Sequence, residues 1–150
     1  MKQYRLVIIS LILLVVAGCG MAQREQEQVY RVITKYEELT QLLENFPEDG
    51  VLLDLRDNRE YENAHCIGSI NVPFDDDGSW LMKCLEEQQW QNKTIYLMCG
   101  GGKRSGDAFN LLTENKIPRV VYITFGYEEY IGSQGYENSE GGGVCDCYQQ

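Results

Sequence analysis

The sequence predicts an α/β fold, in which an open, mainly parallel sheet of five strands carries helices on both faces. Short apolar runs alternate with stretches of helical periodicity, which is the pattern of repeated strand–helix units. One of these runs, VLLDL at Val51–Leu55, is continuous rather than alternating, as in strands buried on both faces. The chain has 150 residues, enough for one ordinary core and too few for two large ones.

The first strand is expected at Val29–Ile33. Thr34 is followed three residues later by Glu37, so a capping box is expected to open a helix there. Apolar residues at the spacing i, i+3, i+4, i+7 mark the buried face of this helix, namely Leu39, Leu42, Leu43 and Phe46. The strand Val51–Leu55 follows.

The second half of the domain repeats the alternation. A weaker strand is expected after the first two, and then helices and strands take turns to the end of the domain. The expected elements are a strand at Ser69–Pro73, a helix at Trp80–Trp90, a strand at Thr94–Met98, a helix from about Ser105 to Asn115, a strand at Arg119–Ile123 and a short helix around Tyr127–Tyr130.

The start of the chain has the composition of an export signal. Lys2 and Arg5 precede an apolar run, Leu6–Gly18, which is shorter than the roughly 20 residues that a membrane-spanning helix needs. Val16-Ala17-Gly18-Cys19 resembles the lipobox of bacterial lipoproteins, which implies lipidation of Cys19. Cleavage after Ala22 and an uncleaved anchor are the alternatives.

These segments predict the domain organisation of an exported protein that is lipid-anchored to a bacterial envelope membrane. The remaining chain after the last short helix is rich in Gly, Ser and Asn, which is typical of a poorly ordered tail. The expected parts are a signal peptide at 1–18, a lipid-anchored tether at 19–28, one domain at 29–131 and a flexible tail containing Gly and Cys at 132–150.

The charge of the chain argues against a polyanionic partner. The sequence has 13 Lys and Arg against 23 Asp and Glu, a net charge of −10. Removal of residues 1–18 would delete two basic residues and no acidic one, and would move the net charge to −12. Such a charge repels nucleic acid and anionic lipid surfaces, so no nucleic-acid partner is expected.

The six cysteines lie at positions 19, 66, 84, 99, 145 and 147. If Cys19 is acylated, five remain, so at least one thiol stays unpaired in an oxidising compartment. No C-x-x-C spacing occurs and His65 is the only histidine, so a zinc site is not expected. Cys145 and Cys147 could form a redox pair, bind a soft metal or be idle thiols. Asp75–Asp77 lack the spacing of a calcium loop, and no metal or organic cofactor is expected.

The stretch CGGGKRS at Cys99–Ser105 is the candidate catalytic and anion-binding site. Cys99 directly follows the predicted strand Thr94–Met98, and ligand crevices in such sheets lie at the carboxyl ends of strands. Gly100, Gly101 and Gly102 allow backbone N–H groups to turn inward as an anion-binding nest, and the next helix points its N-terminus there. Lys103 and Arg104 add positive charge. These donors favour the nucleophilic thiolate form of cysteine.

Cys99, four residues, and then Arg104 and Ser105 resemble the active-site loop of rhodanese domains, the single-domain sulfurtransferases. The upstream segment Asp54–Phe74 is similar to a second family segment, D-x-R, E-[FY] and G-H-I-x-G-A-x-N-x-P. Asp54, Arg56, Glu60, Tyr61, His65, Gly68, Asn71 and Pro73 match it, whereas Ala64, Cys66 and Ser69 depart from it. Downstream, Phe125–Tyr130 is similar to the closing family motif G-G-[FY]-x-x-W, with Phe125 and Tyr130 substituted.

The resemblance implies a rhodanese-like fold and a sulfurtransferase that moves sulfane sulfur from a donor such as thiosulfate to a thiol or cyanide through a Cys99 persulfide. The terminal sulfur would rest among the N–H groups of Gly100–Ser105, and the two cations would attract a small anionic donor; a protein acceptor is also open. Four residues between cysteine and arginine favour sulfur transfer, because phosphatases and arsenate reductases with this fold have five.

The remaining residues of the resemblance are expected to support the site. Arg56 and Glu60 are expected to form a local ion pair. Asp54 lies beside Arg56 at the carboxyl end of the strand Val51–Leu55. Arg104 could instead brace the loop against a carboxylate. His65 is expected to hold a structural turn and not to act as a base. Two functions besides sulfur transfer stay open: a non-catalytic module that binds an anion or persulfide, and a redox protein in which Cys145 or Cys147 resolves oxidised Cys99.

Overall fold

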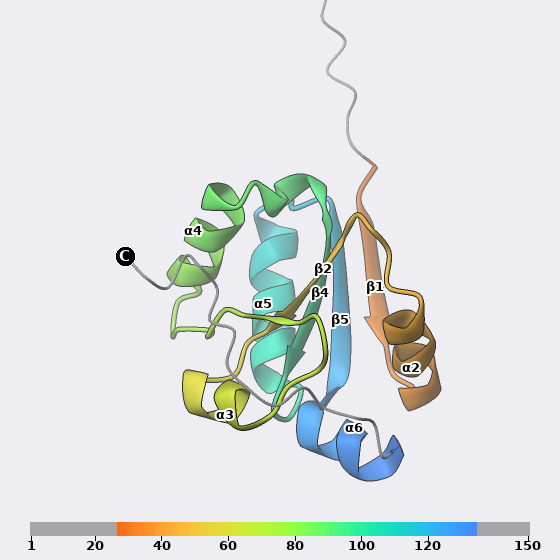
Figure 1. The fold of residues 1–150 in the computed structure, drawn as a ribbon. Coiled ribbons are helices and arrows are strands. Elements are labelled where there is room, and N and C mark those ends of the chain that lie inside the picture. The colour runs from red at the N-terminus through yellow and green to blue at the C-terminus, as the bar shows by residue number, and fades with distance from the viewer. Residues whose placement is uncertain (1–26, 135–150) are drawn as a thin grey trace, which may run out of the picture.

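The computed structural model describes residues 27–134 and contains a five-stranded sheet with helices on both faces (Figure 1). The strand order is β1-β5-β4-β2-β3, and every neighbouring pair is parallel. The predicted fold class is therefore confirmed. The strands are β1 (Val29–Ile33), β2 (Gly50–Asp54), β3 (Ile70–Asn71), β4 (Thr94–Cys99) and β5 (Arg119–Gly126).

The helices lie between the strands in the chain and on two sides of the sheet in space (Figure 1). Helices α4 and α5 pack on one face, and α2 and α6 pack on the other, while α3 lies at the lower edge. They are α2 (Tyr36–Glu44), α3 (Asn58–Asn63), α4 (Ser79–Glu87), the short 3-10 helix η1 (Trp90–Asn92), α5 (Lys103–Glu114) and α6 (Tyr127–Gln134).

Each face of the sheet has its own core, because successive residues of a strand point to opposite sides. Along β4, Ile95, Leu97 and Cys99 belong to the core under α4 and α5, whereas Tyr96 and Met98 belong to the core under α2 and α6. All five are at most 5% exposed. Burial on both faces explains why β2 and β4 have almost no polar residues.

Two predictions about helices in the first half were wrong. Helix α2 begins at Tyr36, with Lys35 at the N-cap and no capping side chain, so Thr34 does not open it. The sequence pattern also predicted no helix between β2 and β3, where α3 forms.

The helix expected at Trp80–Trp90 is divided, because Gln89 takes a left-handed backbone conformation between α4 and η1.

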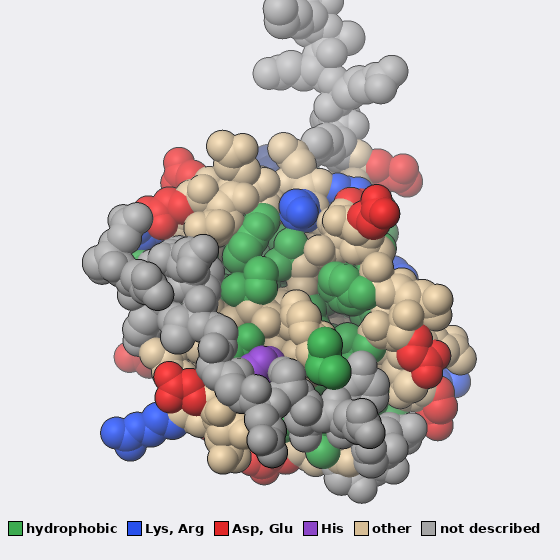
Figure 2. Space-filling view, in the orientation of Figure 1, with side chains coloured by type: hydrophobic (Ala, Val, Ile, Leu, Met, Phe, Trp, Pro, Cys, Tyr) green, Lys and Arg blue, Asp and Glu red, His purple; other side chains and the backbone are tan. Residues whose placement is uncertain are grey.

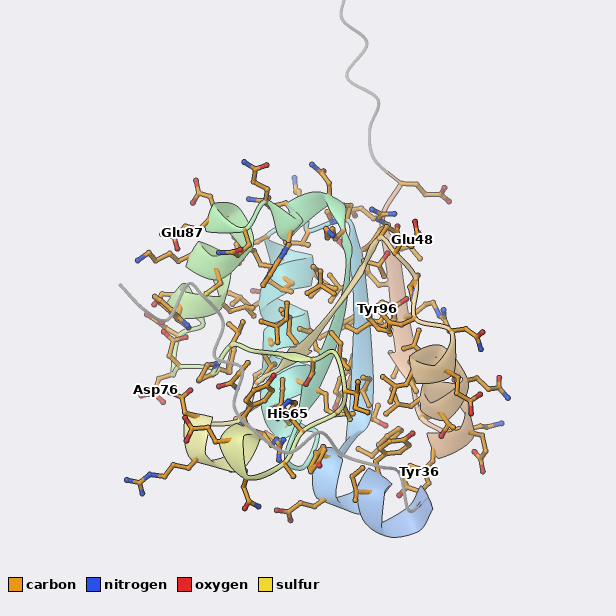
Figure 3. The ribbon with its side chains drawn as sticks, viewed as in Figure 1. Tyr36, Glu48, His65, Asp76, Glu87 and Tyr96 are labelled. Carbon is orange, nitrogen blue, oxygen red and sulfur yellow. The ribbon has the colours of Figure 1, made fainter. Side chains whose placement is uncertain are left out.

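The last strand and helix are longer than predicted. β5 continues three residues past Ile123 to Gly126, and α6 continues to Gln134, so the expected domain boundary at residue 131 falls inside a helix. Tyr36 joins α2 to α6: its hydroxyl donates to Glu129, and its ring meets Phe125 edge to face (Figure 3). This contact holds α6 against the sheet.

Several expectations concern parts of the chain outside residues 27–134. These are the signal peptide, lipidation at Cys19, most of the tether, and the tail with Cys145 and Cys147. Within the described residues, none of the helices is both long enough and apolar enough to span a bilayer.

Candidate active site

The residues predicted for the site meet at the carboxyl edge of the sheet, at the bottom of Figure 1. Cys99 is the last residue of β4, and Asp54 is the last residue of the neighbouring strand β2. The loop after Cys99 leads directly into α5, and the segment after Asp54 leads into α3. Parallel pairing brings these two loops side by side.

The sulfur of Cys99 is enclosed by polar groups of its own loop. Its side chain is 1% exposed. The backbone N–H of Gly102 donates to Sγ at 3.1 Å, and the hydroxyl of Ser105 lies 3.4 Å from Sγ. Hydrogen-bond donors at these positions stabilise negative charge on sulfur. The loop therefore presents a thiol with two groups able to support its anionic form.

Gly102 is the glycine that the loop geometry requires. Its φ is +82°, in the left-handed region, and it forms the N-cap of α5. A Cβ at this position would overlap the carbonyl oxygen of Thr124. A Cβ on Gly101 would meet nothing within 4 Å, so the backbone of the three glycines is not equally constrained.

Both cations of the loop are paired with carboxylates. Arg104 donates through two nitrogens to Glu60, at 3.0 and 3.3 Å, and each side chain is 34% exposed. Lys103 contacts Asp107 at 2.6 Å, with the lysine side chain 87% exposed. The geometry matches the alternative in which Arg104 braces the loop against a carboxylate, and it leaves less free positive charge for a donor than the sequence predicted.

Helix α3 places Glu60 opposite the loop. Asp57 accepts from the backbone N–H of Glu60 at 2.9 Å, and the Glu60 side chain accepts from the N–H of Asp57 at 3.2 Å. This is a complete capping box. The signal was present in the sequence as Asp57 with Glu60 three residues on, and it would have predicted α3.

The prediction of an ion pair between Arg56 and Glu60 was wrong. Arg56 pairs with Asp54 at 2.7 Å, and both side chains are almost fully buried. Arg56 also donates to the carbonyl oxygen of Ala64 at 2.7 Å and lies 3.9 Å from the ring centroid of Tyr127. Arg56 is too fully occupied by these partners to serve Glu60, which instead turns to Arg104.

His65 has the contacts of a structural residue. It is 6% exposed, its Nδ1 lies 2.8 Å from the carbonyl oxygen of Tyr61, and its ring stacks on the Tyr61 ring at 3.8 Å (Figure 3). The Tyr61 hydroxyl in turn donates to Ser69 at 2.7 Å. These contacts hold the turn between α3 and β3.

Cys66 differs from Cys99 although both are buried and free. Burial, and next the charge of Asp54, raise the pKa of the Cys66 thiol to about 12. Its Sγ lies 3.7 Å from the Sδ of Met98, on the sheet face opposite to Cys99. Cys66 is therefore a core residue and remains a neutral thiol at physiological pH.

The acidic loop before α4 caps that helix. Asp77 accepts from the backbone N–H of Ser79 at 2.9 Å, and Asp75 accepts from the Ser79 hydroxyl at 2.9 Å and the N–H of Trp80 at 3.1 Å. Carboxylates in these positions satisfy N–H groups that a helix leaves unpaired. In residues 27–134, no group of three or more His, Cys, Asp or Glu is placed to hold a metal ion.

Comparisons with known proteins agree with this architecture. A sequence model of the rhodanese-like domain matches residues 35–133. Among curated proteins, the chain is 32% identical over 83 residues to the tRNA uridine(34) hydroxylase of Cronobacter sakazakii; the alignment covers 55% of this chain and 24% of that protein. The chain thus spans about a quarter of the length of the first curated relatives it matches.

Solved structures show the same fold. The thiosulfate sulfurtransferase of Pseudomonas aeruginosa superposes with a TM-score of 0.62 at 22% identity, over 77% of this chain and 21% of that one. The Alr3790 protein of Anabaena superposes with a TM-score of 0.60 at 21% identity, over 76% of this chain and 83% of that one. At these identities, the likeness establishes the fold alone.

Proposed function

The chain belongs to the rhodanese-like domain family, and from this premise we propose that it is a sulfurtransferase that carries sulfane sulfur on Cys99. The observation that carries the proposal is the loop around the sulfur: the N–H of Gly102 and the hydroxyl of Ser105 both lie within hydrogen-bond reach of Sγ. The proposed donor is a small anion such as thiosulfate, and the acceptor is a thiol or cyanide.

The reaction is a double displacement. The Cys99 thiolate attacks the outer sulfur of thiosulfate, a Cys99–sulfur bond forms, and the sulfur–sulfur bond of the donor breaks. Sulfite leaves with the electron pair of that bond. An acceptor thiolate or cyanide then attacks the terminal persulfide sulfur, and the electron pair of the persulfide bond returns to Cys99 as the thiolate. No net oxidation occurs.

The loop supports this chemistry by holding negative charge on sulfur. Charge is present on Sγ before the first step and on the terminal sulfur after it, and preorganised backbone donors stabilise such charge without reorganising. Because Cys99 is 1% exposed, a bulky donor cannot reach Sγ directly. Gly101 is exposed and Gly100 is half-buried, so a small donor could approach the loop at these two glycines.

The hydroxylase activity named for the curated relatives is a weaker candidate for this chain. Those relatives match over only about a quarter of their length. The net charge of −10 also disfavours a nucleic-acid substrate. A non-catalytic persulfide-binding module and a redox protein that uses Cys145 or Cys147 are further candidates, and both of those cysteines lie outside the described residues.

Mass spectrometry after thiosulfate treatment separates these functions. Sulfur transfer requires a gain of about 32 Da, one sulfur atom, on the peptide containing Cys99. The gain should disappear on adding cyanide and should be absent in Cys99→Ala, while Cys66→Ala should retain it. A disulfide from Cys99 without sulfur uptake would support the redox protein, and no change at Cys99 would support the binding module.

We also propose that the domain is exported and lipid-anchored through Cys19. The support is the order of residues: basic start, apolar run Leu6–Gly18, and the lipobox-like end. Expressed in a bacterium with labelled palmitate, the full chain should incorporate label and sediment with membranes. Cys19→Ala should lose both. Release of an unlabelled wild-type protein cleaved after Ala22 would contradict lipidation but not export.

A further inference from the structure

The carbonyl oxygen of Gly102 has more hydrogen-bond donors than it can fully use. The backbone N–H of Gly106 donates to it at 3.0 Å, the Ser105 hydroxyl at 3.0 Å and the Tyr122 hydroxyl at 3.1 Å. A carbonyl oxygen has two lone pairs, so three donors compete for two positions. One of the donors can turn elsewhere at small cost.

Ser105 is the donor with further acceptors in reach. Its Oγ lies 3.2 Å from the carbonyl oxygen of Ile123 and 3.4 Å from the Sγ of Cys99, and Ser105 is fully buried. The hydroxyl has a single proton and rotates freely between these acceptors. The N–H of Gly106, by contrast, is fixed in direction by the helix. A negatively charged sulfur attracts the Ser105 proton more strongly than a neutral carbonyl does.

We propose that Tyr122 is a positioning residue for the Cys99 thiolate: by occupying the second lone pair of the Gly102 oxygen, it leaves the Ser105 proton for Sγ. The inference rests on the proposed role of Cys99 as the nucleophile. Tyr122 acts on the sulfur through Gly102 and Ser105.

The packing around Tyr122 fits this role. Its hydroxyl reaches Gly102 by passing over Gly106, where a Cβ would lie 3.1 Å from the Tyr122 oxygen. Glycine inside a helix is less stable than alanine, and here it provides room for the phenol. Phe109 supports the ring at 5.8 Å between centroids, and Tyr30 meets Phe109 at 6.1 Å.

The Tyr122 hydroxyl also stays protonated when sulfur is charged. Burial, and next the negative charge of Cys99, raise the pKa of Tyr122 above its ordinary value. A phenol that keeps its proton remains a donor to Gly102 when Cys99 carries negative charge. The same geometry therefore serves both protonation states of Cys99.

The test is the pH dependence of Cys99 alkylation by iodoacetamide, followed by mass spectrometry of the Cys99 peptide. In Tyr122→Phe, alkylation below the midpoint of the profile should be about three- to tenfold slower, with rates converging at high pH, because one hydrogen bond to the thiolate is weakened. Ser105→Ala should slow alkylation at least as much. In the Ser105→Ala background, Tyr122→Phe should have no further effect.

Two additional variants separate positioning from general stability. Tyr30→Phe, at the far end of the same aromatic row, should leave the profile unchanged. Gly106→Ala improves helix propensity, so it should not unfold α5, yet it should displace the phenol by a few tenths of an ångström and shift the profile in the same direction as Tyr122→Phe. Melting temperatures measured in parallel report the fold.

A Tyr122→Phe profile that superposes on the wild type would overturn the inference. So would a Tyr122→Phe effect that persists in full without the Ser105 hydroxyl. Alkylation needs no sulfur transfer, so these outcomes are independent of the thiosulfate experiment. Cys99 could take up no sulfur while the effect of Tyr122→Phe on alkylation still depends on the Ser105 hydroxyl. In that case the proposed function fails and the positioning role of Tyr122 stands.

Discussion

Gly102 makes the most specific steric demand in the loop Cys99–Ser105. It combines a φ of +82° with a position where a side chain would overlap the Thr124 carbonyl oxygen. Left-handed backbone costs a non-glycine residue about 1–3 kcal/mol, and the overlap adds to it. We therefore expect Gly102→Ala to lower the free energy of unfolding, measured in urea, by about 2 kcal/mol or more.

Gly101→Ala is the matched control. A Cβ there meets nothing within 4 Å, and the residue does not have a positive φ. The free energy of unfolding of the Gly101→Ala variant should stay within about 0.5 kcal/mol of the wild-type value. Equal losses in both variants would mean that the loop requires glycine for flexibility and not for the left-handed conformation of Gly102.

The buried thiol of Cys66 gives a prediction for alkaline pH. Its pKa is raised from the ordinary 9.0 to about 12 by burial first and Asp54 second. Below about pH 9 the thiol is neutral in both folded and unfolded chains, and the stabilisation is complete. Above it, the unfolded chain loses the proton first, so Cys66 should reduce stability by about 1.4 kcal/mol per pH unit.

Cys66→Ala isolates this contribution. The variant lacks the titrating group, so the difference in unfolding free energy between wild type and variant should shrink as the pH rises from about 8 to about 10. The remaining titrating groups are common to both proteins and cancel in the difference. A difference that stays constant across this range would contradict a buried, neutral Cys66.

At the scale of elements, the strands were well predicted and the contacts between the loops at the site were not. Continuous apolar runs identified β2, β4 and most of β5, because burial on both faces leaves a strong pattern. β5 runs on to Gly126 because the register against β4 shifts between Leu97 and Cys99, and pairing between separate strands has no local sequence signal. The end of β5 also needs a glycine, because a Cβ on Gly126 would overlap the Gly100 carbonyl oxygen.

The same limit applies to the site. The position of Cys99 at a strand end, and of its glycines before a helix, could be predicted because seven consecutive residues encode them. The contact of Tyr122 with Gly102 joins residues 20 positions apart, and that of Glu60 with Arg104 joins residues 44 apart. Such contacts depend on how loops meet at the sheet edge, so the sequence pattern alone assigned Glu60 to its near neighbour Arg56.

The contact between α3 and the loop Cys99–Ser105 is testable with Glu60→Gln. Glutamine keeps an oxygen that can accept from the N–H of Asp57, so the helix cap should survive while the charge pair with Arg104 is lost. Both side chains are 34% exposed, so the free energy of unfolding should fall by less than about 1 kcal/mol. Persulfide formation should be slower by about two- to fivefold, because the loop is less firmly held.

Glu62→Gln is the control for this pair. Glu62 lies on the same helix, is exposed, and would lose the same charge. Single-turnover persulfide formation in Glu62→Gln should match the wild type. If Glu60→Gln and Glu62→Gln are equally slow, the effect comes from overall charge and not from bracing of the loop.

The charge of the whole molecule determines how an anionic donor approaches. The net charge is −10, and acidic side chains surround the more apolar centre of the face in Figure 2. Lys103 and Arg104 are the cations next to the thiol, and both are paired with carboxylates. Their fields largely cancel beyond the loop. We therefore expect the long-range field to repel the proposed thiosulfate donor, although the N–H of Gly102 would attract it at contact.

Salt should consequently accelerate the first step. The Debye length falls from about 30 Å at 0.01 M to about 8 Å at 0.15 M, which screens distant acidic residues but not contacts within the loop. Over this range, the second-order rate constant for persulfide formation from thiosulfate should rise about two- to fivefold. Alkylation of Cys99 by uncharged iodoacetamide should not change. A thiosulfate rate that falls with salt would mean that Lys103 and Arg104 dominate the approach despite their carboxylate partners, and Lys103→Gln would then slow the reaction most at low salt.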